Sequence, residues 1–528
     1  MRGKRGKGIR RIGDAARLAF ASASEHDFSM TTPLESSWTR REFLGSLAAA
    51  SAAAAFPTAV RGAEKPARKP NVLFIMADDM RVELGCYGSR FRAHTPNLDA
   101  LAQTGVRFDR NYCQYPLCNP SRASLFTGRK PSTTGVIGNR TNFRDAHPNW
   151  ISLPQWFKEN GYVTARAGKI FHGGIDDPKA WGSTSGGEAA DEGGMQSAEV
   201  GHVAHKPKPA APPANANESE GRRRAEYSDR IVVLEGNGEG HGDYHTADAT
   251  IANLRKYKDV PFFLGCGFVK PHSPPTAPQK FFDLYDVDKI TLPPDFAASP
   301  TVPPGFPKAA IRPRNADLFI GRSASEAEAK EVIRAYLAAI SWVDWNIGRV
   351  LAELDALGLR ENTIVVFVAD HGYQLGEKGK WSKAGSLFEM GTRVPLMMAA
   401  PGMKGNGASC ARIVESLDIY PTLVELCGLP AQPELEGASL VSLLQDPKAK
   451  WARPAYSVWS EDGKTVHGVA VRTEEWRYAE YGKDGANGAM LLDPHDADEL
   501  KNFVADEKNA AVVAELSALA RKYAAAFG

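Results

Sequence analysis

A cysteine at position 118 begins a segment whose composition suits chemistry on an anion. The segment is Cys118-Asn119-Pro120-Ser121-Arg122-Ala123-Ser124-Leu125-Phe126-Thr127-Gly128-Arg129. Because proline is favoured in the first turn of a helix, Pro120 predicts that residue 118 lies at a helix N-terminus, where backbone N–H groups attract negative charge. A nucleophile placed there would face an anionic substrate. The alternative is that Cys118 is a small buried apolar residue, as single cysteines usually are.

Two pairs of metal-ligating residue types follow apolar runs. Asp78-Asp79 follows the run at residues 71–76, and Asp370-His371 follows the run at 363–368. Adjacent carboxylates repel each other unless a cation neutralises them, and Ca²⁺ prefers oxygen ligands. Taken alone, each pair is better explained as a helix cap or a turn. Taken together with the Cys118 segment, the two pairs predict a divalent-cation site.

Basic residues occur in three short clusters that complement these acids. The clusters are Gly168-Lys169-Ile170-Phe171-His172-Gly173, Lys270-Pro271-His272 and Lys380-Trp381-Ser382-Lys383. A single lysine or histidine is usually a solvated surface residue, and we assign Lys380 to that class. Lys169, His172, His272 and Lys383 are the candidates for anion binding and proton transfer.

The elements that must position these residues alternate between strands and helices. Apolar runs of strand length at residues 71–76, 262–268 and 363–368 each end in polar residues. Helical patterns cover residues 96–104, 153–160, 246–256 and 325–357, and Ser325 and Glu328 have the spacing of a capping box. The alternation predicts an α/β fold: a large parallel or mixed sheet flanked by helices, with the site along its carboxyl edge.

Two regions depart from this alternation. Residues 182–224 are rich in Gly, Ala, Pro, Glu and Ser without an apolar period, which predicts a low-complexity surface insertion. Strand-like runs at residues 469–472, 476–481 and 490–492, followed by a helical pattern at 509–525, predict a small antiparallel sheet with a helix. We therefore expect a catalytic domain at residues 70–452 and a C-terminal subdomain at 453–528, with no internal repeat.

The first 65 residues are predicted to direct export. Arg40-Arg41 precedes an Ala-rich apolar run from residue 43 to about residue 60, which resembles a twin-arginine signal. The run is short and is followed by basic residues, so we expect cleavage near Gly62 or Ala63 in place of a permanent membrane span. The prediction is a periplasmic or extracellular protein whose partners include the export machinery.

Composition limits the function classes. The chain has 528 residues, 43% of them hydrophobic, and a formal net charge of +2. A chain of this size buries a large core, and its balanced charge argues against a nucleic-acid binder. Six cysteines are too few for a disulfide scaffold, and no specific bridge is predicted.

The Cys118 segment resembles the motif of the type I (formylglycine) sulfatases, C-x-P-S-R-x-S-x-x-T-G-R, at every defined position. In that family a maturation enzyme oxidises the cysteine to formylglycine, whose hydrated aldehyde attacks sulfur. The resemblance implies an alkaline-phosphatase-like fold and one Ca²⁺. The implied ligands are Asp78, Asp79, Asp370, His371 and the modified residue 118.

The same resemblance implies roles for the basic residues. Lys169 and Lys383 would bind sulfate, and His272 or Lys383 would protonate the leaving group. His172 would remove the proton of the second hydroxyl, and Arg122 would hold residue 118 by hydrogen bonds and charge.

Among sulfatases, the chain is most similar to the iduronate 2-sulfatase group. The shared segments are G-K-I-F-H at 168–172, V-K-P-H-S-P at 269–274, D-H-G-Y-Q-L-G-E at 370–377, W-S-K at 381–383 and T-R-V-P at 392–395. This implies a uronic acid 2-sulfate in a sulfated polysaccharide as substrate, with Lys270, Arg393 and Arg472 as candidate partners of the uronate carboxylate. Two alternatives stay open: a phosphate-ester or phosphonate hydrolase of the same superfamily, and a non-catalytic protein that binds sulfated glycans.

Overall fold

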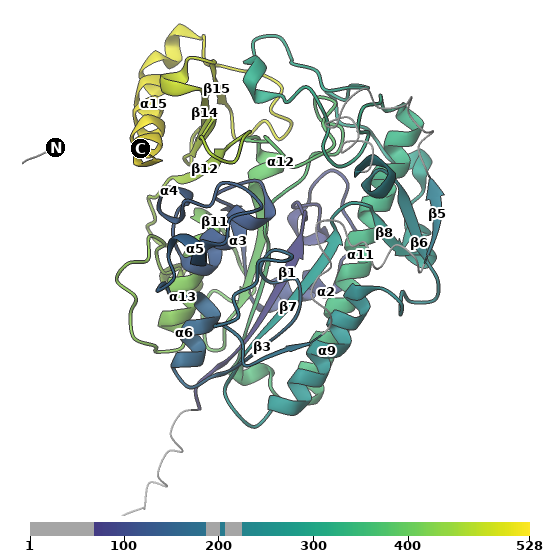
Figure 1. The fold of residues 1–528 in the computed structure, drawn as a ribbon, viewed down its shortest axis with the longest axis vertical. Helices are drawn as coiled ribbons and strands as arrows, with labels where there is room; N and C mark the ends of the chain where they lie inside the picture. Colours follow the sequence, from purple (N-terminus) through teal and green to yellow (C-terminus); the bar gives the residue numbers. More distant parts are fainter. Residues whose placement is uncertain (1–67, 186–200, 206–223, 528) are drawn as a thin grey trace, which may run out of the picture. The chain divides into compact units, whose positions relative to one another are not determined.

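The three predicted apolar runs are adjacent strands at the centre of an eight-stranded mixed sheet, with the strand order β11-β2-β10-β9-β1-β7-β3-β4 (Figure 1). The computed structural model describes residues 68–185, 201–205 and 224–527, and residues 67–528 form one compact unit. The strands of the sheet are β1 Asn71–Asp78, β2 Val106–Tyr112, β3 Val163–Gly168, β4 Ser183–Ser185, β7 Phe262–Pro271, β9 Thr363–Ala369, β10 Arg393–Ala399 and β11 Ser409–Glu415.

The middle of this sheet is parallel, which brings the predicted site residues to one edge. β1 pairs in parallel with β7 and β9, and β3 pairs in parallel with β7. β10 is the antiparallel neighbour of both β9 and β2. Because carboxyl ends of parallel strands meet, the residues that follow β1, β3, β7 and β9 converge.

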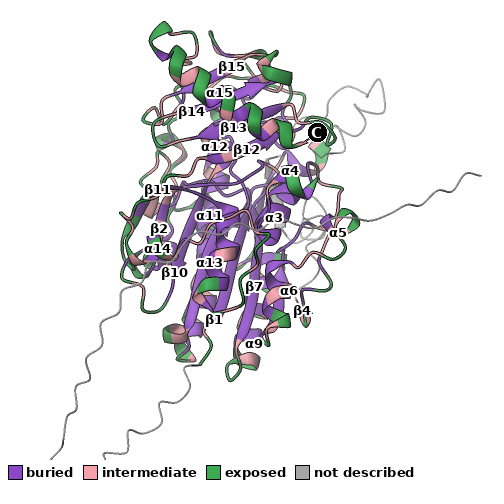
Figure 2. Cartoon of the chain, turned by 90° about the vertical axis from the view of Figure 1, so that its left-hand side faces the viewer, coloured by how far each residue is buried: buried purple, intermediate pink, exposed green. Residues whose placement is uncertain are grey.

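Helices cover both faces of the sheet (Figure 1). Leu73 and Ile75 of β1 face a core built with α2, α9 and α11, whereas Phe74 and Met76 face a second core built with α3, α6, α13 and α14. The bounds are α2 Pro96–Thr104, α9 Gly242–Tyr257, α11 Glu326–Ala356, α3 Cys118–Thr127, α6 Leu153–Glu159, α13 Ile419–Leu426 and α14 Val441–Gln445. Short helices are α4 Pro131–Thr134, α5 Phe143–Ala146, α10 Gln279–Phe282 and α12 Glu389–Thr392. Because both faces of the large sheet are buried, a central strand such as β1 is continuously apolar (Figure 2).

The predicted helices are confirmed, with small differences at their ends. The capping box of α11 is present, since the Ser325 hydroxyl accepts from Glu328 N at 3.3 Å and the Glu328 carboxylate accepts from Ser325 N at 3.2 Å. α9 begins four residues before the predicted Thr246, because the His241 ring caps it by accepting from Asp243 N at 3.0 Å.

A second sheet lies at the C-terminal end, as predicted. Its antiparallel strands are β12 Ala455–Trp459, β13 Gly468–Arg472, β14 Arg477–Tyr481 and β15 Ala489–Leu492, and helix α15, Ala510–Ala524, packs on them. The first of these strands has no counterpart in the sequence prediction. The domain boundary at residue 453 remains a prediction, because the described residues cluster as one unit.

Residues 182–224, predicted to be a surface insertion, contain two short strands. β4 adds to the edge of the large sheet beside β3. β5, Gly201–His205, pairs with β6, Ile231–Leu234, in a three-stranded sheet completed by β8, Thr276–Pro278. Both additions are short and lack the apolar alternation that predicts strands. The predicted signal and residues 186–200 and 206–223 lie outside the described residues.

The cysteines and the helices bear on two further expectations. All six cysteines fall within the described residues and are free. Within residues 68–185, 201–205 and 224–527, no helix combines the length and the apolar character needed to cross a bilayer.

Candidate active site

Cys118 is the first residue of α3, as Pro120 predicts. The preceding Leu117 is extended, and all ten residues of the helix are buried. The Cys118 thiol is 3.4 Å from Asp78 Oδ1 and 3.2 Å from His371 Nε2. The sulfur therefore lies at the positive end of a buried helix and beside two predicted metal ligands.

The predicted metal ligands converge from the ends of β1 and β9 and from the N-terminus of α3. Ligand atoms of Asp78, Cys118, Asp370 and His371 all lie within 4.8 Å of one another. Asp79 adopts the left-handed conformation, with φ of 61°. Its N–H donates to Asp370 Oδ1 at 3.2 Å, and its carbonyl oxygen accepts from the Tyr336 hydroxyl at 2.6 Å. Such a conformation is strained for a non-glycine residue and persists only where the surroundings enforce it.

The donor chemistry of this cluster fits a divalent cation. Asp78, Asp79 and Asp370 are each 0% exposed, and Asp79 Oδ1 accepts no hydrogen bond from the described residues. Burial raises the pKa of Asp79 to about 6, although Lys383, His272 and His371 oppose the rise. Three buried carboxylates this close need cationic compensation, and their oxygens are suited to a hard ion.

Three of the four basic candidates lie at the same cluster. The Lys169 ammonium pairs with Asp78 Oδ2, and Lys383 Nζ donates to Asp79 Oδ2 at 2.9 Å. His272 forms a second potential ligand group with Asp78, Asp79 and Cys118. His172 lines a cavity together with Lys169. The structure thus places Lys169, His272 and Lys383 at the cluster and His172 beside Lys169 in the adjoining cavity.

Arg122 connects α3 to the residues at the ends of β3 and β9. Its Nε donates to Asp370 Oδ2 at 2.8 Å, and Nη1 donates to the carbonyl oxygens of Lys169 and Ile170, each at 2.8 Å. Its charge interacts with Cys118, which lies one turn earlier on α3, and the expected hydrogen bonds to the modified residue 118 stay a prediction. Arg122 therefore joins α3 to the ends of β3 and β9, and Asp370 balances its buried charge.

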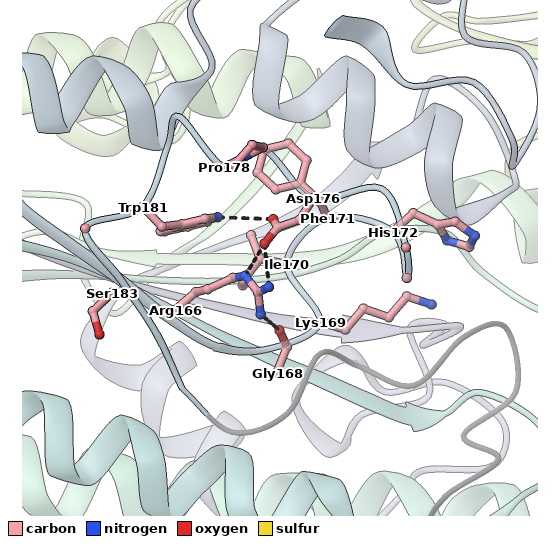
Figure 3. Close-up of a pocket in the computed structure, with 13 residues that line it drawn as sticks. Arg166, Gly168, Lys169, Ile170, Phe171, His172, Asp176, Pro178, Trp181 and Ser183 are labelled. Carbon is pink, nitrogen blue, oxygen red and sulfur yellow. Dashed lines mark hydrogen bonds and ion pairs between the residues drawn. The ribbon is translucent and has the colours of Figure 1, made fainter. Parts of the chain in front are cut away.

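A cavity of about 510 Å³ opens beside Lys169 and His172. The side chains of Lys169 and His172 lie together at one end of it, and Arg166, Asp176 and Trp181 lie at the other (Figure 3). Arg166 Nε donates to Asp176 Oδ2 at 2.8 Å, and the Trp181 indole donates to Asp176 Oδ1 at 3.2 Å. An arginine within the otherwise apolar β3 was the sequence signal for this wall.

Lys380 is not a surface residue. Its side chain is almost fully buried, and Nζ donates to the carbonyl oxygens of Arg312 and Arg314 at 3.3 and 2.9 Å. Burial lowers its pKa to about 8. No local sequence pattern indicates this burial, because the acceptors are backbone atoms of a loop that is distant in the sequence.

The three cations considered for a uronate carboxylate have protein partners. Lys270 is buried, and Nζ donates to the carbonyl oxygens of His272 and Pro274 at 2.9 and 2.8 Å, which fixes the loop that carries His272. Arg393 Nε donates to the Asp109 carbonyl at 2.7 Å, and Arg472 lies 3.7 Å from Glu389.

Sequence reasoning missed two supporting carboxylates. Asp243, in the first turn of α9, accepts from the N–H groups of Val269 and Lys270 at 2.8 Å each, and so holds the end of β7. Burial raises its pKa to about 6. Asp317 lies 3.8 Å from Lys383 Nζ. Asp243 follows a helix-start pattern, whereas Asp317 is in a loop and carries no local signal.

Comparison with known proteins identifies the family. The sequence profile of the sulfatase family matches residues 70–429, a range that includes every residue of this cluster. This chain belongs to the sulfatase family. A profile described as the C-terminal part of N-sulphoglucosamine sulphohydrolase matches residues 376–525 of the sulfatase.

Individual relatives agree with this assignment. A sulfatase from Formosa agariphila is 34% identical over 461 residues, covering 83% of this chain and 85% of that protein. Iduronate 2-sulfatase from Mus musculus is 30% identical over 489 residues, covering 77% of this chain and 84% of that protein. A solved structure in complex with its substrate, D-glucosamine-2-N,6-O-disulfate, has a TM-score of 0.66 at 22% identity and covers 87% of this chain and 98% of that chain. The predicted alkaline-phosphatase-like sulfatase fold is confirmed, and the protein is a sulfuric ester hydrolase.

Proposed function

We propose that this sulfatase is an exported, calcium-dependent enzyme that hydrolyses a sulfate ester of a carbohydrate through formylglycine made from Cys118. The observation that carries the proposal is the position of Cys118 Sγ, 3.4 Å from Asp78 Oδ1 at the N-terminus of α3. At this position the reacting atom, the metal ligands and the helix N-terminus would all act on the same anionic group.

Positive charge on two sides of the cluster would stabilise the transferring sulfuryl group. Lys169 forms an ion pair with Asp78, and Lys383 forms an ion pair with Asp79. Residue 118, once oxidised and hydrated, supplies the hydroxyl that attacks sulfur, and Ca²⁺ held by the carboxylates, His371 and residue 118 would neutralise sulfate oxygens. Preorganised cations in a buried site act more strongly than in water.

Proton transfer is proposed for the histidines. His272 is grouped with Asp78, Asp79 and Cys118, so it lies close to the reacting centre and can protonate the departing oxygen together with Lys383. His172 lines the cavity beside Lys169, which suits a base that acts on residue 118 when sulfate leaves. Arg122 keeps Asp370 and the backbone after β3 in place for both steps.

The proposed substrate is a uronic acid 2-sulfate in a sulfated polysaccharide. It is supported by the shared segments at 168–172, 269–274 and 370–377 and by the 30% identity to iduronate 2-sulfatase from Mus musculus. Lys270, Arg393 and Arg472 have other partners. We therefore expect the uronate carboxylate to bind to groups that line the cavity beside Lys169.

Two measurements test the proposal. Mass spectrometry of the peptide that contains residue 118, from protein made in its native cell, is expected to find the aldehyde; a plain thiol would contradict the chemistry. Values of kcat/KM are then compared for a 2-sulfated uronate disaccharide, a 6-sulfated glucosamine, an aryl sulfate and an aryl phosphate. Preference for the glucosamine ester would overturn the substrate assignment alone, and preference for the phosphate would overturn sulfate-ester hydrolysis as the main activity.

A further inference from the structure

A loop that precedes α11 is hydrogen-bonded to the segment that carries Lys383. Asn315 Oδ1 accepts from Trp381 N at 2.9 Å, and Asn315 Nδ2 donates to the Gly379 carbonyl at 3.2 Å. Lys380 Nζ donates to the Arg314 carbonyl at 2.9 Å. These bonds come from both segments and link the loop around Asn315 to residues 379–381.

Asp317 lies at the end of this loop and is 0% exposed. Its Oδ1 accepts from Arg224 Nη2 at 3.0 Å and lies 3.8 Å from Lys383 Nζ. Its Oδ2 accepts no hydrogen bond from the described residues. An unpaired buried carboxylate oxygen is destabilising, so packing alone does not account for an aspartate here.

Lys383 is therefore held between two carboxylates, Asp79 at 2.9 Å and Asp317 at 3.8 Å. A lysine side chain is long and flexible and loses rotamer entropy when its ammonium is fixed, so a single contact positions it poorly. Asp79 belongs to the group that fits a cation, and a bound ion would share its charge. Asp317 belongs to neither potential ligand group, so its attraction for Lys383 persists when the ion is bound.

We propose that Asp317 is a positioning residue that holds the Lys383 ammonium at the catalytic edge while Asp79 ligates the ion. The proposal rests on the proposed function, because it assumes that Lys383 acts on the sulfate ester. Asp317 touches neither sulfur nor ion and acts only through Lys383. The competing explanation is that Asp317 serves only to pair with Arg224 and stabilise the loop.

A double-mutant cycle separates the two explanations. The variants are Asp317→Asn, which keeps shape and removes charge, Lys383→Met, and the two combined. The matched control is Asp229→Asn, since Asp229 is also a buried carboxylate that pairs with an arginine, Arg322, at 2.8 Å. We expect Asp317→Asn to lower kcat by about 30-fold with KM within about 3-fold, in the range of losses from misplaced acid–base and electrostatic groups.

In the Lys383→Met background, Asp317→Asn is expected to change kcat by less than about 3-fold, because a residue that acts through Lys383 has nothing left to position. Asp229→Asn is expected to leave kcat unchanged. An equal loss in both backgrounds, or no loss in either, would overturn the proposal.

Crystal structures grown with calcium give a readout that does not depend on turnover. In Asp317→Asn the Lys383 ammonium is expected to leave hydrogen-bonding distance of Asp79, and in Asp229→Asn it is expected to stay. A Lys383 that does not move would overturn the positioning role. If the wild-type protein hydrolyses no sulfate ester, the proposed function fails, and the crystal structures still decide the position of Lys383.

Discussion

The surroundings of residue 118 favour an anion at the reacting atom. Burial and the neighbouring Asp78 raise the pKa of the Cys118 thiol, but Lys169, Lys383 and His371 outweigh them and hold that pKa well below its usual range. The protein therefore stabilises negative charge at this point before any substrate arrives. A buried structural cysteine has the opposite property, as burial raises the pKa of Cys266 to about 12.

Replacement of the nucleophile tests this point directly. Cys118→Ala is expected to lower kcat on an aryl sulfate by at least about a thousandfold, since removal of a nucleophile has effects of that size or larger. The control is Cys410→Ala, because Cys410 is also buried and free but lies on β11, at the far edge of the sheet. Circular dichroism establishes that both variants fold. Normal turnover by Cys118→Ala would refute the mechanism.

Among the elements, a short segment after β11 joins the two sheets through buried acids. Asp418 Oδ2 accepts from Glu415 N at 2.9 Å, and Glu415 Oε1 accepts from Tyr456 N of β12 at 3.0 Å. Burial and the neighbouring Asp418 raise the pKa of Glu415 from its usual 4.5 to about 7. The link between the sheets therefore contains a carboxyl group that favours its neutral form.

This link predicts a pH-dependent stability. The folded-state pKa of Glu415 is raised, so the folded protein binds more protons than the unfolded chain between pH 4.5 and about 7, and stability falls as pH rises through that window. Glu415→Gln removes this titration. From about pH 5 to about pH 8, wild type is expected to lose on the order of 2 kcal/mol of unfolding free energy relative to the variant. Urea titrations at the two pH values measure it, and parallel behaviour would contradict the assignment.

Elements with a strong local pattern were predictable from the sequence. β1, β7 and β9 are continuous apolar runs, and α11 carries its own capping box. β4 has three residues, and the short β5 follows a Gly-rich stretch, so neither contains enough pattern to be recognised.

The site was predictable where the family motif or a strand end marks it, as at Cys118, Asp78 and Asp370. The burial of Lys380 and the contacts of Asp317 were not predicted, because the partners of both residues are far away in the sequence. Lys380 binds carbonyls 66 and 68 positions away, and Asp317 acquires its role from Lys383 and Arg224. Contacts of this kind follow from the tertiary fold and leave no local trace.

At the scale of the whole molecule, the site forms only when segments that are far apart in the sequence come together in the folded protein. Asp79 and Lys383 are 304 positions apart and share a hydrogen bond of 2.9 Å. An ion bound by the buried carboxylates at this point would therefore stabilise the folded state of the entire large domain.

Metal removal should therefore affect both activity and melting. Exhaustive chelation is expected to abolish sulfate-ester hydrolysis and lower Tm, because an ion that binds only the folded state at about 100 times its Kd adds about 2.7 kcal/mol. Calcium is expected to restore both. Elemental analysis accompanies the assay, and full activity in protein free of metal would refute the cation site.

Export is testable with the full chain. Replacement of Arg40 and Arg41 by lysine is expected to leave the protein in the cytoplasm, because a twin-arginine signal is read through that pair. Fractionation of native cells followed by immunoblotting measures it, with Arg68→Lys as the matched control outside the signal. Unchanged export of the double variant would indicate the general secretory route.

The burial of α3 bears on whether residue 118 is oxidised before or after the protein folds. Cys118 is 2% exposed, and all ten residues of the helix it begins are buried. With so little of the thiol exposed, a protein-sized oxidising enzyme has poor access to it in the folded chain. Under the proposed function, we therefore expect maturation to precede folding, and a chain that folds first to stay an inactive thiol. Yield of active enzyme would then be governed by the race between oxidation and folding in the producing cell.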